Sequence, residues 1–183
     1  ADPALEALGV PLLRLEAPCA PIPVAAAAER DSEWLLFTSG TTGVPKLVAH
    51  SLAALTGAIA TAAPAGARPV WATFYDIRRY GGLQVLLRAL TGGSALALSD
   101  ADEPLPDHLR RLARFGVTHM SGTPSHWRRL LMGGQPGAFR PGYVRLSGEI
   151  ADQPVLDGLR SLFPHARIVH AYASTEAGVV FEV

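Results

Sequence analysis

Short apolar segments alternate with amphipathic ones along most of this chain, from Trp34 onward. Short runs of apolar and β-branched residues predict strands, whereas apolar residues spaced three or four positions apart predict helices. The predicted strands cover residues 34–37, 47–49, 70–74, 94–98, 117–120, 143–146 and 167–172. The predicted helices cover residues 52–65, 81–90, 105–115, 124–132 and 155–163. This alternation predicts an α/β fold, with a layered, largely parallel sheet flanked by helices.

The first 33 residues lack this alternation. Residues 5–8 have the character of a helix end that Gly9 stops, residues 10–15 have strand character, and prolines follow at positions 18, 21 and 23. Proline favours extended backbone outside a hydrogen-bonded ladder. We therefore expect residues 1–33 to be a Pro- and Ala-rich leader or linker, and residues 34–183 to form one α/β unit. Because the chain begins with Ala1 rather than methionine, we expect it to be a portion of a longer protein.

The segment between the first two predicted strands is small and polar: Thr38-Ser39-Gly40-Thr41-Thr42-Gly43-Val44-Pro45-Lys46. Glycines let the backbone turn tightly and leave its N–H groups open. Such N–H groups, together with hydroxyls and a lysine, can bind phosphate oxygens, so we interpret the segment as a polyphosphate-binding loop. The alternative is an ordinary hairpin turn of the same composition. The segment does not follow the P-loop pattern, because no Ser or Thr directly follows Lys46.

A second polar segment, Tyr172-Ala173-Ser174-Thr175-Glu176, follows the last predicted strand. Ligands of parallel sheets bind at the carboxyl ends of strands, and both polar segments follow strands. The tyrosine could stack on a base, Thr175 could bond a phosphate, and Glu176 could bind Mg²⁺. The alternative is a capped turn into a further element, with Ser174 or Thr175 as the cap.

Both segments resemble signatures of the adenylate-forming superfamily, which contains acyl-CoA synthetases, peptide-synthetase adenylation domains and luciferases. Ser39 to Lys46 resembles its phosphate loop, and Tyr172 to Glu176 resembles its second hallmark motif. Between them, Leu146-Ser147-Gly148-Glu149 lies where members carry a small-residue segment that lines the adenine. The resemblance spans about residues 34–178, and it implies the central part of the family's N-terminal domain.

The resemblance also implies a role for each residue of these motifs. The phosphate loop would hold the β- and γ-phosphates of ATP through Ser39, Thr41, Thr42, Lys46 and the backbone of Gly40 and Gly43. The adenine slot would consist of Gly148, Glu149, His170, Ala171 and Tyr172, with Tyr172 stacking on the base. Thr175 would contact the α-phosphate and Glu176 would bind Mg²⁺, so these two are the expected catalytic residues. His170 departs from the Asn or Gln that members often carry there.

The family reaction joins a carboxylic acid to AMP with release of pyrophosphate, and then passes the acyl group to the thiol of CoA or of a carrier protein. The resemblance therefore implies an acid–thiol ligase whose partners are the acid, the thiol acceptor and the remainder of the same enzyme. The family's hinge and C-terminal catalytic lysine have no counterpart before Val183, so we expect little turnover from this fragment alone. Two alternatives are a non-catalytic nucleotide-binding or scaffold module and an unrelated P-loop-like nucleotidase.

The acid itself is not identified by the motifs. Asp76 lies several residues before the position at which peptide-synthetase domains hold an amino group, which favours a substrate other than an amino acid. Tyr80 is expected either to border the carboxylate pocket or to pack at a helix start. Arg78 and Arg79 could attract an anionic substrate, although paired arginines are more often exposed. His119 and His126 are expected to be packed residues without a catalytic role.

The composition of the chain excludes several other classes of function and of site. The 16 basic and 16 acidic residues balance, so the chain has no broad electrostatic footprint for nucleic acid. The single Cys19 excludes a disulfide within the chain and a cysteine-built metal cluster. No apolar run reaches the length of about 18 residues that a membrane span needs. With no visible signal peptide, we expect a cytoplasmic protein.

Overall fold

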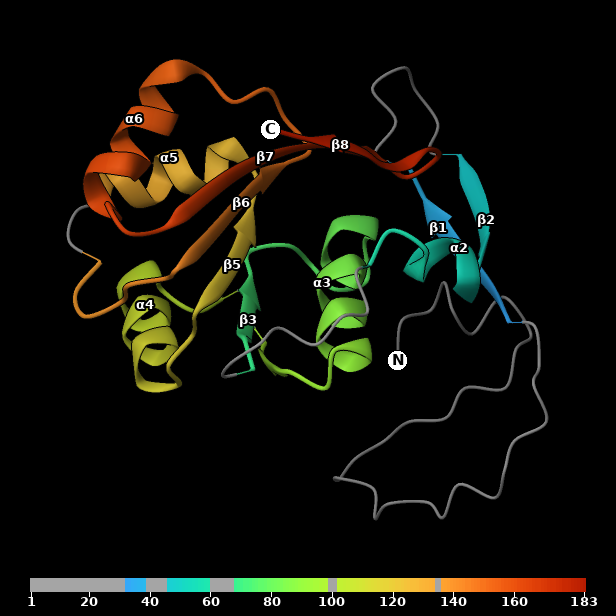
Figure 1. The fold of residues 1–183 in the computed structure, drawn as a ribbon, viewed down its shortest axis with the longest axis horizontal. Coiled ribbons are helices and arrows are strands. Elements are labelled where there is room, and N and C mark those ends of the chain that lie inside the picture. Colours follow the sequence, from blue (N-terminus) through green and yellow to red (C-terminus); the bar gives the residue numbers. More distant parts are fainter. Residues whose placement is uncertain (1–31, 39–45, 60–67, 99–101, 134–135) are drawn as a thin grey trace, which may run out of the picture. The chain divides into compact units, whose positions relative to one another are not determined.

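The computed structural model describes residues 32–38, 46–59, 68–98, 102–133 and 136–183 (Figure 1). The predicted features of residues 1–31 and the phosphate-loop residues Ser39 to Gly43 lie outside these ranges. Within the described part of the chain, no helix is both long and apolar enough to span a membrane.

Six strands form one sheet that is mostly parallel. Their order across the sheet is β4 (Ala95–Ala97), β3 (Val70–Thr73), β5 (His119–Gly122), β6 (Tyr143–Ser147), β7 (Arg167–Ser174) and β8 (Gly178–Glu182). The pairs from β4 to β7 are parallel, and only β8 is antiparallel to its neighbour. The predicted α/β fold with a largely parallel sheet is therefore confirmed, whereas strand β8 was missed by the sequence pattern.

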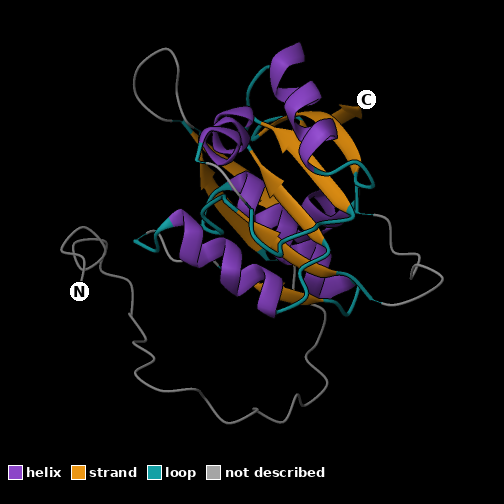
Figure 2. Cartoon of the chain, turned by 90° about the vertical axis from the view of Figure 1, so that its left-hand side faces the viewer, coloured by secondary structure: helices purple, strands orange, loops and turns teal. Residues whose placement is uncertain are grey.

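Helices cover both faces of this sheet (Figures 1 and 2). One face packs against α4 (Leu105–Arg114), α5 (Pro124–Met132) and α6 (Gln153–Leu162). Their apolar stripes bury side chains against the sheet residues Ala72, Met120, Val144 and Leu146, and the helical members of this core are Leu109, Leu112, Trp127, Leu130, Val155 and Leu159. The other face is covered by α3 (Tyr80–Thr91), which begins and ends close to the predicted bounds.

Local signals explain where these helices begin. The Thr123 side chain accepts a hydrogen bond from the backbone N–H of His126, and the His126 ring accepts one from the N–H of Thr123. This reciprocal capping arrangement and Pro124 in the first turn fix the start of α5 as predicted. The Asp152 side chain caps α6 in the same way, by accepting from Val155 N–H.

The first two strands do not belong to the parallel sheet. β1 (Glu33–Phe37) and β2 (Leu47–Ser51) pair with each other as an antiparallel hairpin, with Phe37 opposite Leu47. The prediction that the polar loop follows a strand of the parallel sheet is therefore wrong. The prediction that residues 34–37 form a buried strand is also wrong in part, because Leu35 and Phe37 are 55% and 70% exposed. A two-stranded ribbon packed on one side buries only alternate residues, here Leu36.

The hairpin is anchored to α3 through a short helix, α2 (Leu52–Thr56). Ser51 caps α2 as predicted, and Leu55 and Ile59 pack with Leu36 against Leu83 and Leu87 of α3. The predicted helix over residues 52–65 is too long, because the chain turns after Thr56; residues 60–65 lie outside the described ranges. This second apolar cluster holds the hairpin on the first half of α3.

Candidate functional site

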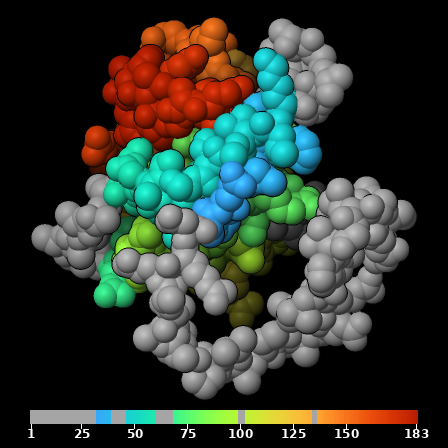
Figure 3. Space-filling model, turned by 90° about the vertical axis from the view of Figure 1, so that its right-hand side faces the viewer, coloured from blue at the N-terminus to red at the C-terminus, as the bar shows by residue number. Residues whose placement is uncertain are grey.

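Tyr80 joins the hairpin and the β7–β8 turn at the start of α3. Its ring centroid lies 5.8 Å from that of His50 in β2. On its other side, a Cβ atom placed on Gly178, the first residue of β8, would lie 3.2 Å from the Tyr80 hydroxyl. Figures 1 and 3 show the β7–β8 turn beside the hairpin. Two segments more than 100 residues apart in the sequence therefore meet at one side chain.

The β7–β8 turn carries Thr175 and Glu176 at its tip. Ser174 and Gly178 face each other across the two strands, and the Ser174 hydroxyl accepts a hydrogen bond of 3.0 Å from Ala177 N–H. The alternative prediction of a capped turn into a further element is thus confirmed for Ser174. Gly178 has a φ of 72°, which favours glycine at the end of the turn. The Glu176 side chain is exposed and forms no hydrogen bond or ion pair within the described part of the chain.

The end of β6 carries Gly148 and Glu149, the residues expected beside the adenine. The Glu149 carboxylate accepts hydrogen bonds from the Ser125 N–H (2.9 Å) and hydroxyl (2.6 Å) at the start of α5. Burial alone would raise the pKa of Glu149, but these hydrogen bonds outweigh it and hold the pKa below its ordinary value. The Glu149 carboxylate is therefore already engaged by the start of α5.

The other three residues expected in the adenine slot lie on β7. The His170 Nε2 atom lies 3.0 Å from the carbonyl oxygen of Glu149, so this side chain links β7 to the end of β6. Ala171 is buried, whereas Tyr172 is 57% exposed. One face of the Tyr172 ring stacks on Phe181 of β8 at a centroid distance of 5.5 Å. A stacking partner for Tyr172 thus already exists within the chain, on one of its two faces.

The phosphate-loop residue that the structure describes is Lys46. It directly precedes β2, and its carbonyl accepts from Thr38 N–H at 2.9 Å while its own N–H donates to the Thr38 hydroxyl at 3.1 Å. These two bonds close the base of the loop. Ser39, Gly40, Thr41, Thr42 and Gly43 belong to the segment between these two anchors and lie outside the described ranges.

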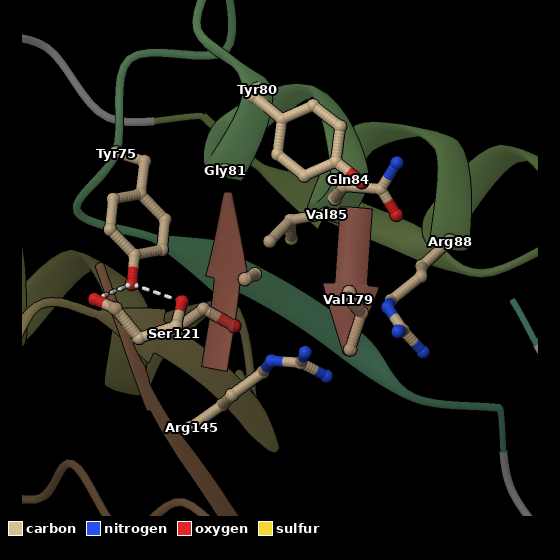
Figure 4. A pocket seen from close by; sticks show the side chains of 11 residues that line it. Tyr75, Tyr80, Gly81, Gln84, Val85, Arg88, Ser121, Arg145 and Val179 are labelled. Carbon is tan, nitrogen blue, oxygen red and sulfur yellow. Dashed lines mark hydrogen bonds between the residues drawn. The ribbon is translucent and has the colours of Figure 1, made fainter. Parts of the chain in front are cut away.

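A cavity of about 30 Å³ lies between α3 and the sheet, next to the β7–β8 turn (Figure 4). Tyr80 borders it, together with Ala173 and Val179, which face each other across β7 and β8. Polar residues also line it, namely Tyr75, Gln84, Arg88, Ser121, Arg145 and Ser147. Tyr80 therefore borders a cavity and also packs at the start of α3, and its place beside the carboxylate stays a prediction. Sequence reasoning missed Arg88 and Arg145, although each is a charged residue within a strongly apolar helix or strand.

Tyr75 fixes one wall of the cavity. Its hydroxyl donates to the Ser147 carbonyl oxygen at 3.0 Å and lies 2.9 Å from the Ser147 hydroxyl. Burial raises the pKa of Tyr75 to about 12 despite these hydrogen bonds, so the phenol stays protonated at neutral pH. The cavity wall thereby connects directly to the end of β6, where the predicted adenine segment begins.

The remaining side chains considered from the sequence lie away from this cavity lining. Asp76 pairs with the exposed Arg78 side chain, and hydrogen bonds from Arg78 lower the pKa of Asp76 to about 2. His119 packs against Trp71 and Tyr143. His126 caps α5, as described above, and stacks on the ring of Phe74. Both histidines are packed residues, as predicted.

Comparison with known proteins identifies the family. The model of the AMP-binding enzyme family matches residues 4–183, nearly the whole chain. The chain belongs to this family of adenylate-forming enzymes, and the resemblance seen in its motifs is confirmed.

Known members show the range of the family. The probable non-canonical nonribosomal peptide synthetase CymA of Salinispora arenicola (strain CNS-205) is 34% identical over 169 residues, which are 89% of this chain and 2% of CymA. VinN in complex with L-aspartate has a TM-score of 0.68 at 25% identity, over 87% of this chain and 42% of VinN. O-succinylbenzoate CoA synthetase of Bacillus subtilis, solved with ATP and a magnesium ion, has a TM-score of 0.68 at 23% identity, over 81% of this chain and 32% of the enzyme. The chain thus spans a small part of its curated relatives and less than half of these solved structures.

Proposed function

We propose that this chain is the ATP-binding part of an enzyme that activates a carboxylic acid as acyl-AMP and transfers the acyl group to a thiol. The observation that carries the proposal is the meeting of the two motif-bearing segments at Tyr80. The hairpin holds the ends of the phosphate loop, and the β7–β8 turn presents Thr175 and Glu176 beside it. The shared position of these segments, next to a cavity, supports one site for triphosphate, metal and acid.

The phosphates and the metal would be held by the loop and the turn together. Mg²⁺ keeps several waters and takes one or two protein carboxylates plus phosphate oxygens. Within the described residues, no group of three or more His, Cys, Asp or Glu side chains could hold a metal, so a dedicated protein cage is absent there. The exposed carboxylate of Glu176, free of protein partners in the described part, fits the role of a single metal ligand. The β- and γ-phosphates would contact Ser39, Gly40, Thr41, Thr42, Gly43 and Lys46, and the α-phosphate would contact Thr175.

The adenine would lie between the end of β6 and β7. Gly148 has a φ of 84°, which favours glycine, and its small size leaves the backbone open to a ligand. We propose that the backbone at Glu149 contacts the base, since its carboxylate is engaged by Ser125. Tyr172 would offer the ring face that Phe181 does not cover, while His170 and Ala171 hold the strand against β6.

The reaction needs positioning and charge stabilisation rather than a covalent nucleophile on the protein. A carboxylate oxygen of the acid attacks the α-phosphorus of ATP, and the bond to the β-phosphate oxygen breaks to release pyrophosphate. A thiolate then attacks the acyl carbon and AMP leaves. Mg²⁺ on the phosphates and the donors of the loop would stabilise the charge on the departing pyrophosphate.

We propose that the acid enters the cavity beside the β7–β8 turn and that it lacks an amino group at the position used by peptide synthetases. No acidic side chain is among the residues that line this cavity, so no carboxylate is available there to bind an ammonium group. The second candidate is an amino acid, which CymA and the complex of VinN with L-aspartate favour. Two thiol acceptors remain as candidates, CoA and a carrier protein. The chain is similar both to a peptide synthetase and to a CoA synthetase, so the comparisons favour neither acceptor.

Transfer of ¹⁸O from the acid to AMP tests the proposed chemistry. The longest natural polypeptide that contains this chain is incubated with ATP, Mg²⁺, CoA or a carrier protein, and a panel of carboxyl-¹⁸O-labelled acids. Because the acid oxygen becomes the bridge to phosphorus and stays there when the thiol attacks carbon, AMP should gain one ¹⁸O with an accepted acid. A non-catalytic nucleotide-binding module would bind ATP without any labelled AMP. A nucleotidase would release product at the same rate with and without acid.

A further inference from the structure

A partly buried positive charge that forms no ion pair with any described residue lies in the wall of the cavity. Arg88 extends from α3, is partly buried, and forms no hydrogen bond or ion pair within the described part of the chain. Burial lowers the pKa of Arg88, the nearby Arg145 lowers it further, and the carboxylate of Glu182, which is paired with Arg145, only partly opposes them. A guanidinium nevertheless stays charged at every physiological pH. An uncompensated charge in a protein interior is costly unless a ligand or water solvates it.

The second arginine of the cavity is already paired. Arg145 on β6 is 7% exposed and forms an ion pair with Glu182 of β8. Figure 4 shows the Arg88 and Arg145 side chains extending toward each other from opposite sides of the cavity. Arg88 and Arg145 line the cavity, and Glu182 pairs with Arg145 from outside the lining, so these three groups carry a net charge of plus one. A ligand with one negative group would balance it.

A hydroxyl without a partner lies in the same lining. Ser121 is 1% exposed, and its buried Oγ atom forms no hydrogen bond with any residue that the structure describes. Buried polar atoms are normally satisfied, so an orphaned donor in a cavity wall indicates a ligand or an ordered water. The Ser121 hydroxyl can donate to an anion while Arg88 provides the charge and further N–H donors.

The positions of these groups along α3 set the distance to the reaction centre. Tyr80, Gln84 and Arg88 are four residues apart, so they lie on one face of the helix. Tyr80 adjoins the β7–β8 turn, and Arg88 lies two turns further along, about 12 Å along the axis. Helical side chains point back toward the N-terminus, which brings the guanidinium nearer to Tyr80. A short acid can therefore have one carboxylate near the turn and a second group near Arg88.

We propose that the acid activated at this site is a small dicarboxylic acid, whose second carboxylate is bound by Arg88 and the Ser121 hydroxyl beside the Arg145–Glu182 pair. This inference rests on the proposed acid-activating function. Arginine binds carboxylates through two parallel N–H···O bonds, so it distinguishes a carboxylate from a methyl group of similar size. The cavity volume of about 30 Å³ admits one such group and excludes a bulky terminus.

Matched pairs of acids test the proposal. Pyrophosphate exchange by the longest natural polypeptide containing this chain is measured with succinate and butyrate, glutarate and pentanoate, and L-aspartate and L-2-aminobutyrate. Hydrogen bonds to charged groups contribute enough to predict a kcat/KM about 10- to 100-fold higher for a diacid than for its monoacid partner. Arg88→Gln should bring this ratio close to one, Ser121→Ala should lower it partially, and the exposed control Arg160→Gln should leave it unchanged. Circular dichroism of each variant verifies folding.

The outcomes separate this inference from the function on which it rests. Exchange with monoacids at equal or higher efficiency would overturn the dicarboxylate proposal and leave acid activation intact. If none of these acids supports pyrophosphate exchange, the result would count against the proposed function. In that case calorimetric titration with succinate and glutarate decides the anion site: binding that Arg88→Gln abolishes supports it, and equal or absent binding to both proteins overturns it.

Discussion

Glu176 and Arg88 both carry charge without an ion-pair partner in the described part of the chain. Glu176 lies in the β7–β8 turn, which adjoins Tyr80, and Arg88 lies two helical turns beyond Tyr80 along α3. A protein gains no stability from such groups, since unpaired charge is at best neutral when exposed and costly when buried. We propose that ligands account for both, Mg²⁺ with triphosphate for Glu176 and an acid for Arg88.

Glu176→Gln is expected to lower acid-dependent pyrophosphate exchange by about 100-fold, because a metal ion provides several kcal/mol of charge stabilisation and each 1.36 kcal/mol is tenfold in rate. The thermal midpoint should not change, since the side chain is exposed and unbonded. Glu33→Gln, at an equally exposed position on β1, is the matched control. Full exchange in Glu176→Gln at saturating Mg²⁺ would refute a metal-binding role.

Little of the cavity lining could be predicted from the sequence. Tyr80 could be singled out because it stands directly before a predicted apolar helix. Arg88 and Arg145 occupy positions in apolar segments, where an arginine that extends to solvent gives the same pattern. The ion pair of Arg145 joins residues 37 positions apart and depends on β8, which was not predicted. Non-local pairing of this kind leaves no periodic signal in the sequence.

At the scale of the helices and strands, α4 is secured by a polar cluster at its start. The Glu103 carboxylate accepts hydrogen bonds from Arg111 at 2.8 and 2.6 Å and contacts His108 Nδ1 at 2.9 Å. These bonds join Glu103, two residues before the helix begins, to His108 and Arg111 within it. Hydrogen bonds from Arg111, opposed by burial and assisted by His108, lower the pKa of Glu103 from 4.5 to about 2.

Glu103→Gln is expected to lower the free energy of unfolding by about 1 kcal/mol at pH 7, after allowance for solvent screening. A carboxylate whose folded-state pKa is depressed stabilises the fold above its unfolded pKa and loses this contribution as pH falls through the folded value. The difference between the two proteins should therefore shrink between pH 4.5 and about 2. Urea unfolding across this range measures it, with Asp157→Asn as a surface control. A difference that does not depend on pH would contradict the assignment.

Gly82→Ala tests the contact between α3 and the connection that precedes it. A Cβ atom at Gly82 would lie 2.6 Å from the Asp76 carbonyl carbon and 2.7 Å from the Ile77 Cα atom, and both are backbone atoms. Overpacking of this kind typically costs about 1–3 kcal/mol, so we expect a lower thermal midpoint and a weaker cavity wall near Tyr80. Gly142→Ala, whose Cβ would find its nearest atom at 3.9 Å, is the control. Equal thermal midpoints for the two variants would show that the backbone at Asp76 and Ile77 moves aside without a cost in stability.

The elements of the parallel sheet were the easiest to predict. Strands β3 to β7 are short apolar runs bounded by helix caps and glycines, and each signal is local in the sequence. The hairpin and β8 were harder, because antiparallel pairing partners are chosen by tertiary contacts that a single segment does not encode. β8 does contain a short apolar run, Val179-Val180-Phe181, but nothing in that run indicates that it pairs back antiparallel on β7.

At the scale of the whole molecule, the described residues form a parallel sheet, a hairpin and an antiparallel turn arranged around the start of α3. The family's two nucleotide motifs lie on the hairpin and on the turn, and the cavity lies between α3 and the sheet at the same place. We propose that residues 34–183 form the ATP-binding unit and residues 1–33 its leader or linker. Packing of this kind brings segments that are distant in the sequence together at one side chain, Tyr80.

Carboxylate-dependent ATP–pyrophosphate exchange tests the central claim most directly, because it requires binding of triphosphate, metal and acid in one site and reversible formation of acyl-AMP. The longest natural polypeptide containing this chain is predicted to exchange labelled pyrophosphate into ATP only when an accepted acid and Mg²⁺ are present. The 183-residue chain alone is predicted to show little exchange. Exchange that proceeds without any carboxylic acid, or ATP hydrolysis to ADP in its place, would contradict the account.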